Sequence, residues 1–147
     1  MPEEEPIERA REDEREGLSP STQAGEFVRE EMEHIREGEH GARSPEQAIA
    51  IGLSKARRAG VKLPPPKRGK ARTKRQARRD LAKGRRRKKP SRRRSRAVRG
   101  ALKRETRRSA SRRALSQHSK RAGRRRSPAS RSAAARKAAQ TRKRRRR

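Results

Sequence analysis

The sequence has no cysteine, no tryptophan and no tyrosine, and Phe27 is the only phenylalanine among its 147 residues. The absence of cysteine excludes disulfide bonds and zinc sites built from thiolates. With one aromatic ring, the chain lacks the stacking platforms on which unpaired bases usually bind. Hydrophobic residues make up only 25% of the chain, so we expect no core that spans its whole length.

Long apolar runs are absent as well. No run approaches the roughly 18 residues needed to cross a bilayer, and we expect no membrane partner. The N-terminus, Met-Pro-Glu-Glu-Glu, has neither the positive region nor the apolar region of a secretory signal, and its acidity argues against an organellar transit peptide. These features predict an intracellular, cytoplasmic protein.

The chain also lacks a recognisable catalytic constellation. It has no glycine-rich phosphate loop after a strand and no nucleophile beside a base. His34 and His40 lie among Glu33, Glu37 and Glu39, and such a set suits a divalent cation. Histidines at the polar end of a helix are nevertheless more often surface residues, and we interpret them so. We therefore predict no enzymatic activity, no cofactor and no bound metal.

Acidic residues are almost missing from the C-terminal half. Residues 67–147 contain 39 Lys and Arg but only two acidic residues, Asp80 and Glu105, which gives a net charge of +37. Residues 1–50 hold 15 acidic residues and six Arg, a net charge of −9. A compact state with the charge density of the C-terminal half repels itself unless a polyanion neutralises it. The distribution predicts a disordered tail with a nucleic-acid partner.

The kind of nucleic acid follows from the residue types. Arg outnumbers Lys by 37 to 12, which favours bidentate phosphate contacts and minor-groove insertion. A tail interrupted by glycine and proline has no rigid element to read base edges. We predict salt-dependent binding to duplex DNA without sequence preference, as in a histone-like or nucleoid-associated protein. Binding to RNA or the ribosome is one alternative, and an adaptor that holds a protein partner through residues 20–63 is another.

The cations expected to bind phosphate follow a proline hinge at residues 64–66. They are Lys67, Arg68, Lys70, Arg72, Lys74, Arg75, Arg78, Arg79, Arg85, Arg86, Arg87, Lys88, Lys89, Arg92, Arg93, Arg94, Arg124, Arg125, Arg126, Arg142, Lys143, Arg144, Arg145, Arg146 and Arg147. Six serines stand beside arginines in the same region, namely Ser91, Ser95, Ser109, Ser111, Ser127 and Ser132. We interpret them as solvated spacers; phosphorylation, which subtracts roughly two charges each, is the alternative.

Two amphipathic helices are predicted before the hinge. The first begins near Ser21 or Thr22 and ends at Gly38, with apolar residues three and four apart. The second begins after Ser44 and ends at Gly60. Because a short glycine-containing connector separates them, the two helices are expected to form an antiparallel hairpin.

The second helix has the clearer start signal. Ser44 is a suitable N-cap, and Pro45 stands at the first helical position, where a missing N–H costs nothing. Gln47 completes a capping box by reaching back to the Ser44 N–H. Small residues on one face of this helix would allow another helix to approach closely.

These patterns predict a mostly disordered chain with one short all-α hairpin near the N-terminus and transient helices in the basic tail. The expected parts are an acidic disordered leader at residues 1–19, the hairpin at 20–63, the hinge at 64–66 and the Arg-rich tail at 67–147. The hairpin core is predicted to contain Ala24, Phe27, Val28, Met32, Ile35, Ala48, Ile49, Leu53 and Ala56. Since so small a unit often needs help to be stable, a homodimer or a protein partner through residues 20–63 is a hypothesis.

The segment RSPEQAIAIGLSKARRAG, residues 43–60, resembles a group of small basic bacterial proteins. In that group a (K/R)S-x-x-QAIAIGLS-x-AR-x-AG helix precedes a Lys/Arg/Ala-rich extension. The resemblance implies a bacterial origin and brings no established activity. The tail separately resembles bacterial linker-histone-like extensions that coat DNA. Its excess of Arg and its lack of a regular AAKP repeat move that comparison toward protamines.

Overall fold

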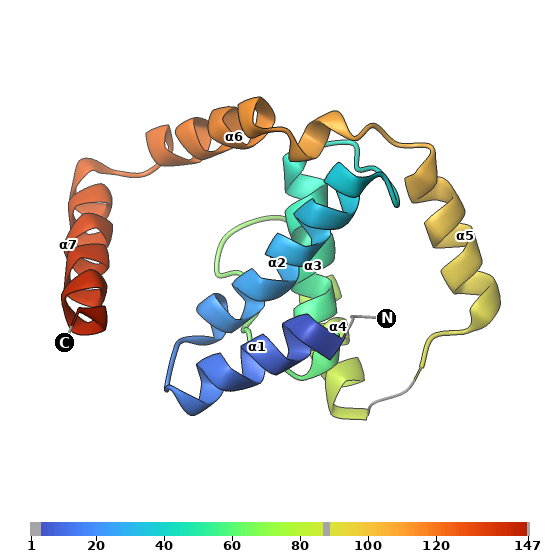
Figure 1. The fold of residues 1–147 in the computed structure, drawn as a ribbon, viewed down its shortest axis with the longest axis horizontal. Helices are drawn as coiled ribbons and strands as arrows, with labels where there is room; N and C mark the ends of the chain where they lie inside the picture. Colours follow the sequence, from blue (N-terminus) through green and yellow to red (C-terminus); the bar gives the residue numbers. More distant parts are fainter. Residues whose placement is uncertain (1–3, 87–88, 147) are drawn as a thin grey trace. The chain divides into compact units, whose positions relative to one another are not determined.

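The computed structural model describes residues 4–86 and 89–146. Over these ranges it is built from seven α-helices and one 3-10 helix, without a strand (Figure 1). They are α1 (Glu4–Arg15), α2 (Pro20–Glu37), α3 (Pro45–Ala59), α4 (Ala71–Arg86), α5 (Arg92–Lys103), η1 (Arg108–Ala110), α6 (Arg112–Arg124) and α7 (Pro128–Arg145). The chain divides into two compact units, Met1–Ser111 and Arg112–Arg147.

The prediction of a mostly disordered chain is wrong, because 76% of the chain is helical. Alanine and arginine, which dominate the basic region, are good helix formers. Serines also cap two of its helices: the side chains of Ser91 and Ser127 each accept a hydrogen bond from the backbone N–H three residues on. An N-cap of this kind satisfies a backbone donor that the helix itself leaves unpaired. At these two positions the exposed serines are caps and not mere spacers. The interpretation as solvated residues is wrong at Ser109, which is buried.

The helices α2 and α3 have ends that are specified locally. Ser19 is the N-cap of α2 and Pro20 occupies its first turn, so the helix begins slightly earlier than predicted. Gly38 and Gly60 end the two helices in the left-handed conformation, with φ of 88° and 110°, and these two ends are confirmed. Glycine adopts such φ values without the steric cost that a Cβ brings.

The predicted cap of α3 is confirmed in part. The Ser44 side chain accepts a hydrogen bond from the Gln47 N–H. The Gln47 side chain reaches back one residue further than expected, since its Oε1 accepts from the Arg43 N–H at 2.6 Å. Both contacts satisfy backbone donors at the start of the helix.

The closest approach of α2 and α3 lies at Gly52. A Cβ at Gly52 would be 2.7 Å from Val28 Cα, so the close packing predicted from small residues is confirmed at this position. Six of the predicted hairpin-core residues are buried: Ala24, Phe27, Met32, Ile35, Ala48 and Ala56. The other three, Val28, Ile49 and Leu53, are half-buried.

The predicted disordered leader instead contains α1, which packs against α2 (Figure 1). Ala10 joins Phe27 and Val61 in the main apolar cluster. An ion pair between Arg9 Nε and Glu26 Oε2 at 2.8 Å adds a polar contact between α1 and α2. These contacts of α1 complete the core within one chain. Phe27 is therefore fully buried and offers no surface for the hypothetical dimer.

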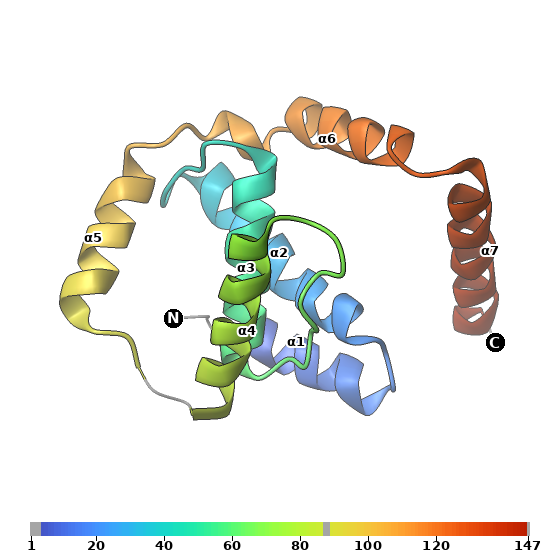
Figure 2. The same ribbon diagram turned by 180° about the vertical axis from the view of Figure 1, so that it is seen from behind.

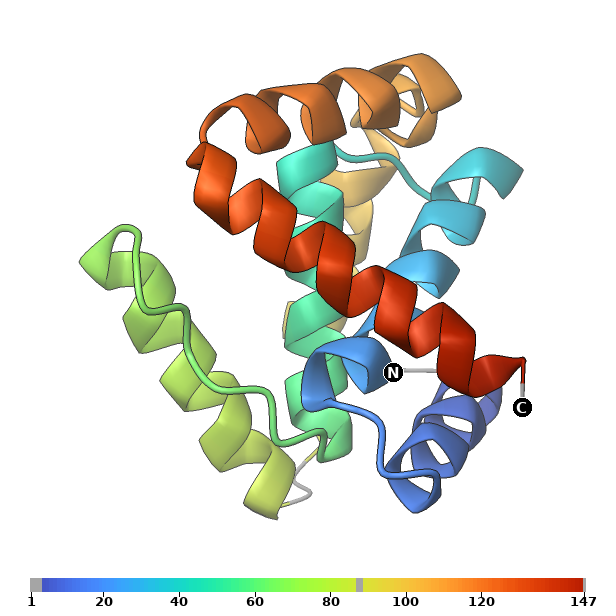
Figure 3. The same cartoon turned by 90° about the vertical axis from the view of Figure 1, so that its left-hand side faces the viewer.

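The first part of the predicted tail packs on the hairpin as α4. After α3 the loop of residues 60–70 returns the chain, so that α4 runs beside α3 in the same direction (Figure 2 and Figure 3). The buried residues of α4 are Ala77, Asp80 and Gly84. A Cβ at Gly84 would lie 2.1 Å from the Arg57 carbonyl oxygen, and a glycine there is what allows the two backbones to meet.

The chain after α5 packs on the connector between α2 and α3. The Gly41 N–H donates to the Leu102 carbonyl and the Ala42 N–H to the Thr106 carbonyl, both at 2.9 Å. Arg36 Nε donates to a carbonyl of η1 at 3.0 Å. These hydrogen bonds include the end of α5 and η1 in the first unit.

The second unit consists of α6 and α7 within the described residues. Neither helix has a buried residue. Capping and intrinsic propensity account for these helices, since there is no apolar face that is fully removed from water. Within residues 4–86 and 89–146 no helix is long and apolar enough to cross a membrane.

Candidate nucleic-acid interface

The predicted phosphate-binding residues lie almost entirely on the surface. Among those that the structure describes, all are exposed except Lys74, which is half-buried. Arg87, Lys88 and Arg147 lie outside the described residues. The side chains are therefore placed to meet a ligand, and their arrangement differs between α4, α5 and the second unit.

On α4 five of the cations share one face that points away from α3. At successive spacings of three, four, four and three residues, they are Arg72, Arg75, Arg79, Lys83 and Arg86. A spacing of three and four residues places side chains on one side of a helix, here opposite to the buried Ala77, Asp80 and Gly84. Lys83 was not among the predicted residues, although its register with Arg79 in the sequence identifies it.

The one acidic residue of α4 does not weaken this cationic face. Asp80 has no exposed surface, and its Oδ1 pairs with Arg58 Nε of α3 at 2.9 Å. Gln76 Nε2 also donates to both Asp80 oxygens, at 3.1 and 3.2 Å. Because the carboxylate is satisfied on the inner side of α4, the outer cations have no anionic neighbour from their own helix.

Arg57 fixes the start of the loop that leads to α4. Its Nε donates to the Leu63 carbonyl at 3.1 Å, and its Nη2 donates to the Pro64 carbonyl at 3.3 Å. Burial lowers the pKa of the Arg57 guanidinium, and the Asp80 carboxylate shifts that pKa in the opposite direction. Arg57 is thus a structural cation, in contrast to the exposed cations of α4.

Helix α5 also carries its cations mainly on one side. Arg92, Arg96, Arg99 and Lys103 follow one another at helical spacing. The helix has no buried residue, and Val98, on another side, is 54% exposed. Repulsion between the cations of this stripe weakens the helix, and an anion bound along the stripe would stabilise it.

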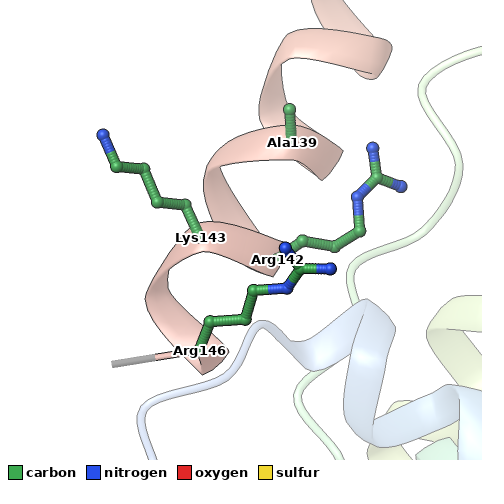
Figure 4. Close-up of a pocket in the computed structure, with 4 residues that line it drawn as sticks. All are labelled: Ala139, Arg142, Lys143 and Arg146. Atoms are coloured by element: carbon green, nitrogen blue, oxygen red, sulfur yellow. The ribbon is translucent and has the colours of Figure 1, made fainter.

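The second unit has the least compensated charge. Residues 112–147 include 16 Lys and Arg and no acidic residue. Figure 4 shows an open groove near the end of α7, lined by Ala139, Arg142, Lys143 and Arg146. Arg142 and Arg146 extend to the same side of the helix, whereas Lys143 extends to the other side.

The two histidines of the first unit are not surface residues, and the interpretation of them as such is wrong. His34 is buried and His40 is half-buried. They meet Glu31, which has no exposed surface, and not the exposed Glu33. One ligand atom from each of Glu31, His34 and His40 lies within 4.8 Å of the others. The sequence signal was the spacing of three residues from Glu31 to His34, which places both on one helix face.

Comparison with protein families gives one match. Residues 20–68 match the model of a family of unknown function, DUF6496. The matched segment covers α2, α3 and the proline segment, and it ends before α4. No curated protein and no solved structure matches the chain.

Proposed function

We propose that the protein binds duplex DNA without sequence preference, through the exposed cations of α4, α5 and the second unit. The observation that carries the proposal is the charge of residues 112–147, where 16 cations stand without an acidic residue and where α6 and α7 bury none of their side chains. Nothing in this segment neutralises its charge from within. A polyanion with regularly spaced phosphates is the ligand that offsets such a charge.

Helical structure in the basic region supports duplex binding in a way that a disordered tail does not. An α-helix with side chains is about 10–12 Å across, and the major groove of B-DNA is about 12 Å wide. At about 1.5 Å per residue, α7 is roughly 27 Å long. The region therefore contains a helix of groove size, where a tail without stable helices was expected.

The arrangement of cations on α7 favours backbone contacts over base readout. Residues 142–146 are five consecutive cations, and five consecutive residues surround a helix of 3.6 residues per turn. A helix that is cationic on all sides meets phosphates on both walls of a groove and has no face reserved for base edges. These contacts position the protein and carry no sequence information.

The anchored helix α4 would contribute differently. Its outer cations are held on a packed unit by the Asp80–Arg58 ion pair and by the backbone contact at Gly84. Phosphates bound there meet side chains whose helix does not need to fold on binding, so less conformational entropy is lost. We therefore assign α4 the role of orienting the first unit on the duplex.

Fluorescence anisotropy with the full-length protein tests this function. A net charge of +37 on residues 67–147 would neutralise at most about 63 Å of duplex, or roughly 18 base pairs, so 20-base-pair duplexes of two unrelated sequences are long enough. We expect equal affinities for both. If about 6–10 phosphates are contacted at once, a plot of log Kd against log salt concentration has a slope magnitude of about 5–9. Absence of binding at low salt contradicts the proposal.

The RNA alternative is separated in the same experiment by an RNA duplex and a single strand of equal length. Tighter binding to DNA duplex is expected, because the described helices offer groove-sized elements and the chain has no aromatic platform for unpaired bases. A preference of tenfold or more for either RNA ligand would replace the DNA proposal with an RNA-binding one.

A further inference from the structure

We propose that Glu31, His34 and His40 bind one Zn²⁺ ion, and that this ion fixes the connector between α2 and α3. The three residues come from two elements. Glu31 and His34 occupy adjacent turns of α2, and His40 lies in the connector beyond Gly38, the C-cap of α2. An ion held by all three would join the connector directly to the helix.

The hydrogen bonding of His40 is the first reason. Its Nδ1 lies 3.0 Å from the Gly41 carbonyl oxygen, and a carbonyl only accepts, so Nδ1 carries the hydrogen. In the neutral ring this leaves a lone pair on Nε2, which lies 3.2 Å from Glu31 Oε1. Two lone pairs at this distance repel each other unless a cation lies between them. An N–H to a backbone carbonyl on the far side of the ring is the usual outer contact of a metal-bound histidine.

The environment of Glu31 is the second reason. Its side chain has no exposed surface, and Lys55 Nζ lies 2.8 Å from Oε2. Neither carboxylate oxygen accepts a hydrogen bond, although Lys55 is at ion-pair distance from Oε2. A buried carboxylate is costly unless its oxygens are satisfied. Coordination of a metal ion by Oε1, with Lys55 on Oε2, would satisfy both.

The chemistry of the ligands selects the metal. Two imidazoles and one carboxylate form a ligand set of zinc sites that keep a fourth position for water, whereas Mg²⁺ and Ca²⁺ prefer oxygen ligands. Bond lengths of about 2.0–2.1 Å at tetrahedral angles place ligand atoms about 3.4 Å apart, and the pair of His40 Nε2 and Glu31 Oε1 is close to this at 3.2 Å. The imidazole rings of His34 and His40 meet at 73°, edge to face, and small side-chain rotations bring the set, now within 4.8 Å, to coordination distance.

The site would act on the part of the first unit that receives α5. The connector donates hydrogen bonds from Gly41 and Ala42 to the carbonyls of Leu102 and Thr106. A metal ion on His40, next to Gly41, would hold those donors in place. The role we infer is therefore structural, because no reaction is required of the ion.

Isothermal titration calorimetry with chelator-treated, tag-free full-length protein tests the proposal, with ZnCl₂ as titrant and MgCl₂ in a parallel titration. We expect one Zn²⁺ per chain and no heat of binding for Mg²⁺. Saturation at about 100 times Kd should raise the Tm by roughly 10 °C. His40→Ala should weaken Zn²⁺ binding at least tenfold, in line with the loss of a protein ligand.

His118→Ala is the matched control, since it removes the third histidine, which lies in α6, and it should bind Zn²⁺ as the natural sequence does. A Lys55→Gln variant keeps the proposal testable if His40→Ala fails to fold. That variant leaves Glu31 without its lysine, so Zn²⁺ should raise its Tm by more than it raises that of the natural sequence. A Tm that Zn²⁺ does not change would mean that a proton alone occupies the gap at His40. Equal loss of Zn²⁺ binding in the His118 and His40 variants would mean that Zn²⁺ does not bind specifically at this site. Either result would overturn the proposal.

Discussion

Residues 20–63 and residues 112–146 are both mainly helical, but for different reasons. The first segment has helices whose apolar residues are buried around Phe27 and whose backbones meet at Gly52. In the second segment neither α6 nor α7 buries a residue, and a serine cap together with helix propensity accounts for α7. A helix maintained by packing resists unfolding, whereas one maintained by capping and propensity is close to its melting point in water. The first segment is therefore the stable one, and under the proposed function the second is the one that binds DNA.

Truncating a buried side chain should give the largest difference between the two segments. Phe27→Ala is expected to lower the free energy of unfolding by about 3–5 kcal/mol, because it opens a cavity in the main apolar cluster. Leu115→Ala in α6, where the residue is half-buried, should cost less than about 1 kcal/mol, as substitutions outside a core do. Urea unfolding followed by circular dichroism measures both. Similar losses of unfolding free energy at Phe27 and Leu115 would contradict the distinction between a packed first segment and an unpacked second segment.

Glycine substitutions sharpen the same comparison. A Cβ at Gly52 meets Val28 Cα at 2.7 Å, whereas one at Gly123 of α6 meets nothing within 4 Å. Gly52→Ala should therefore destabilise the protein by roughly 1–3 kcal/mol through overpacking. Gly123→Ala should raise the helix content or leave it unchanged, because alanine is the better helix former. A destabilising Gly123→Ala would show that α6 is packed more tightly than the described contacts indicate.

Removing the same amount of charge from each of the two units separates their roles in binding. Arg144→Gln with Arg145→Gln should weaken duplex binding about tenfold near 0.15 M salt and reduce the slope of log Kd against log salt by roughly 1.8. Arg11→Gln with Arg29→Gln, both exposed in the first unit, lowers the net charge equally and should change the affinity less than twofold. Anisotropy titrations measure both variants. Equal losses would mean that net charge alone, and not the cations of α7, determines binding.

The smallest expected effect concerns the cap of α7. The Ser127 side chain accepts a hydrogen bond from the Ser130 N–H, so Ser127→Ala should destabilise this helix by about 1 kcal/mol. Because α7 has no buried residue, the loss should appear as lower helicity of the second unit and not as a lower Tm of the first. Circular dichroism at low temperature and the thermal melt report the two quantities. A fall in the Tm would contradict the independence of the two segments.

The sequence predicted the parts of the fold that depend on local signals. Glycines end α2 and α3 at the expected positions, and Ser44 caps α3 where it was expected to. In each case the residue type is suited to that role. What it did not predict were α1 and α4. Their buried faces consist of small residues such as Ala10, Ala77 and Gly84. Such residues contribute little to a hydrophobicity pattern, so the pattern does not show that they are buried. A small residue contributes to packing through the close approach of two backbones, which depends on tertiary contacts.

The candidate sites show the same limit. The list of basic residues was obtained from composition, but the common face of the α4 cations follows only from the docking of Ala77 and Gly84 on α3. Similarly, the sequence placed the histidines beside Glu33, Glu37 and Glu39. His34 does pair with Glu39, with Nδ1 3.9 Å from Oε2, but the buried Glu31 was missed. Glu31 is buried between α2 and α3 with Lys55 2.8 Å away, and a contact across two helices has no signature in the chain.

The central claim is that packing stabilises residues 20–63, whereas residues 112–146 become stable when they bind DNA. Amide hydrogen exchange of the full-length protein, measured with and without a 20-base-pair duplex, tests this claim most directly. The claim predicts slow exchange for residues 20–63 in both states, because packing protects their hydrogen bonds. It predicts fast exchange for residues 112–146 in the free protein and strong protection once the duplex is added. If residues 112–146 exchange at the same rate with and without duplex, the second unit does not bind DNA and the account is contradicted.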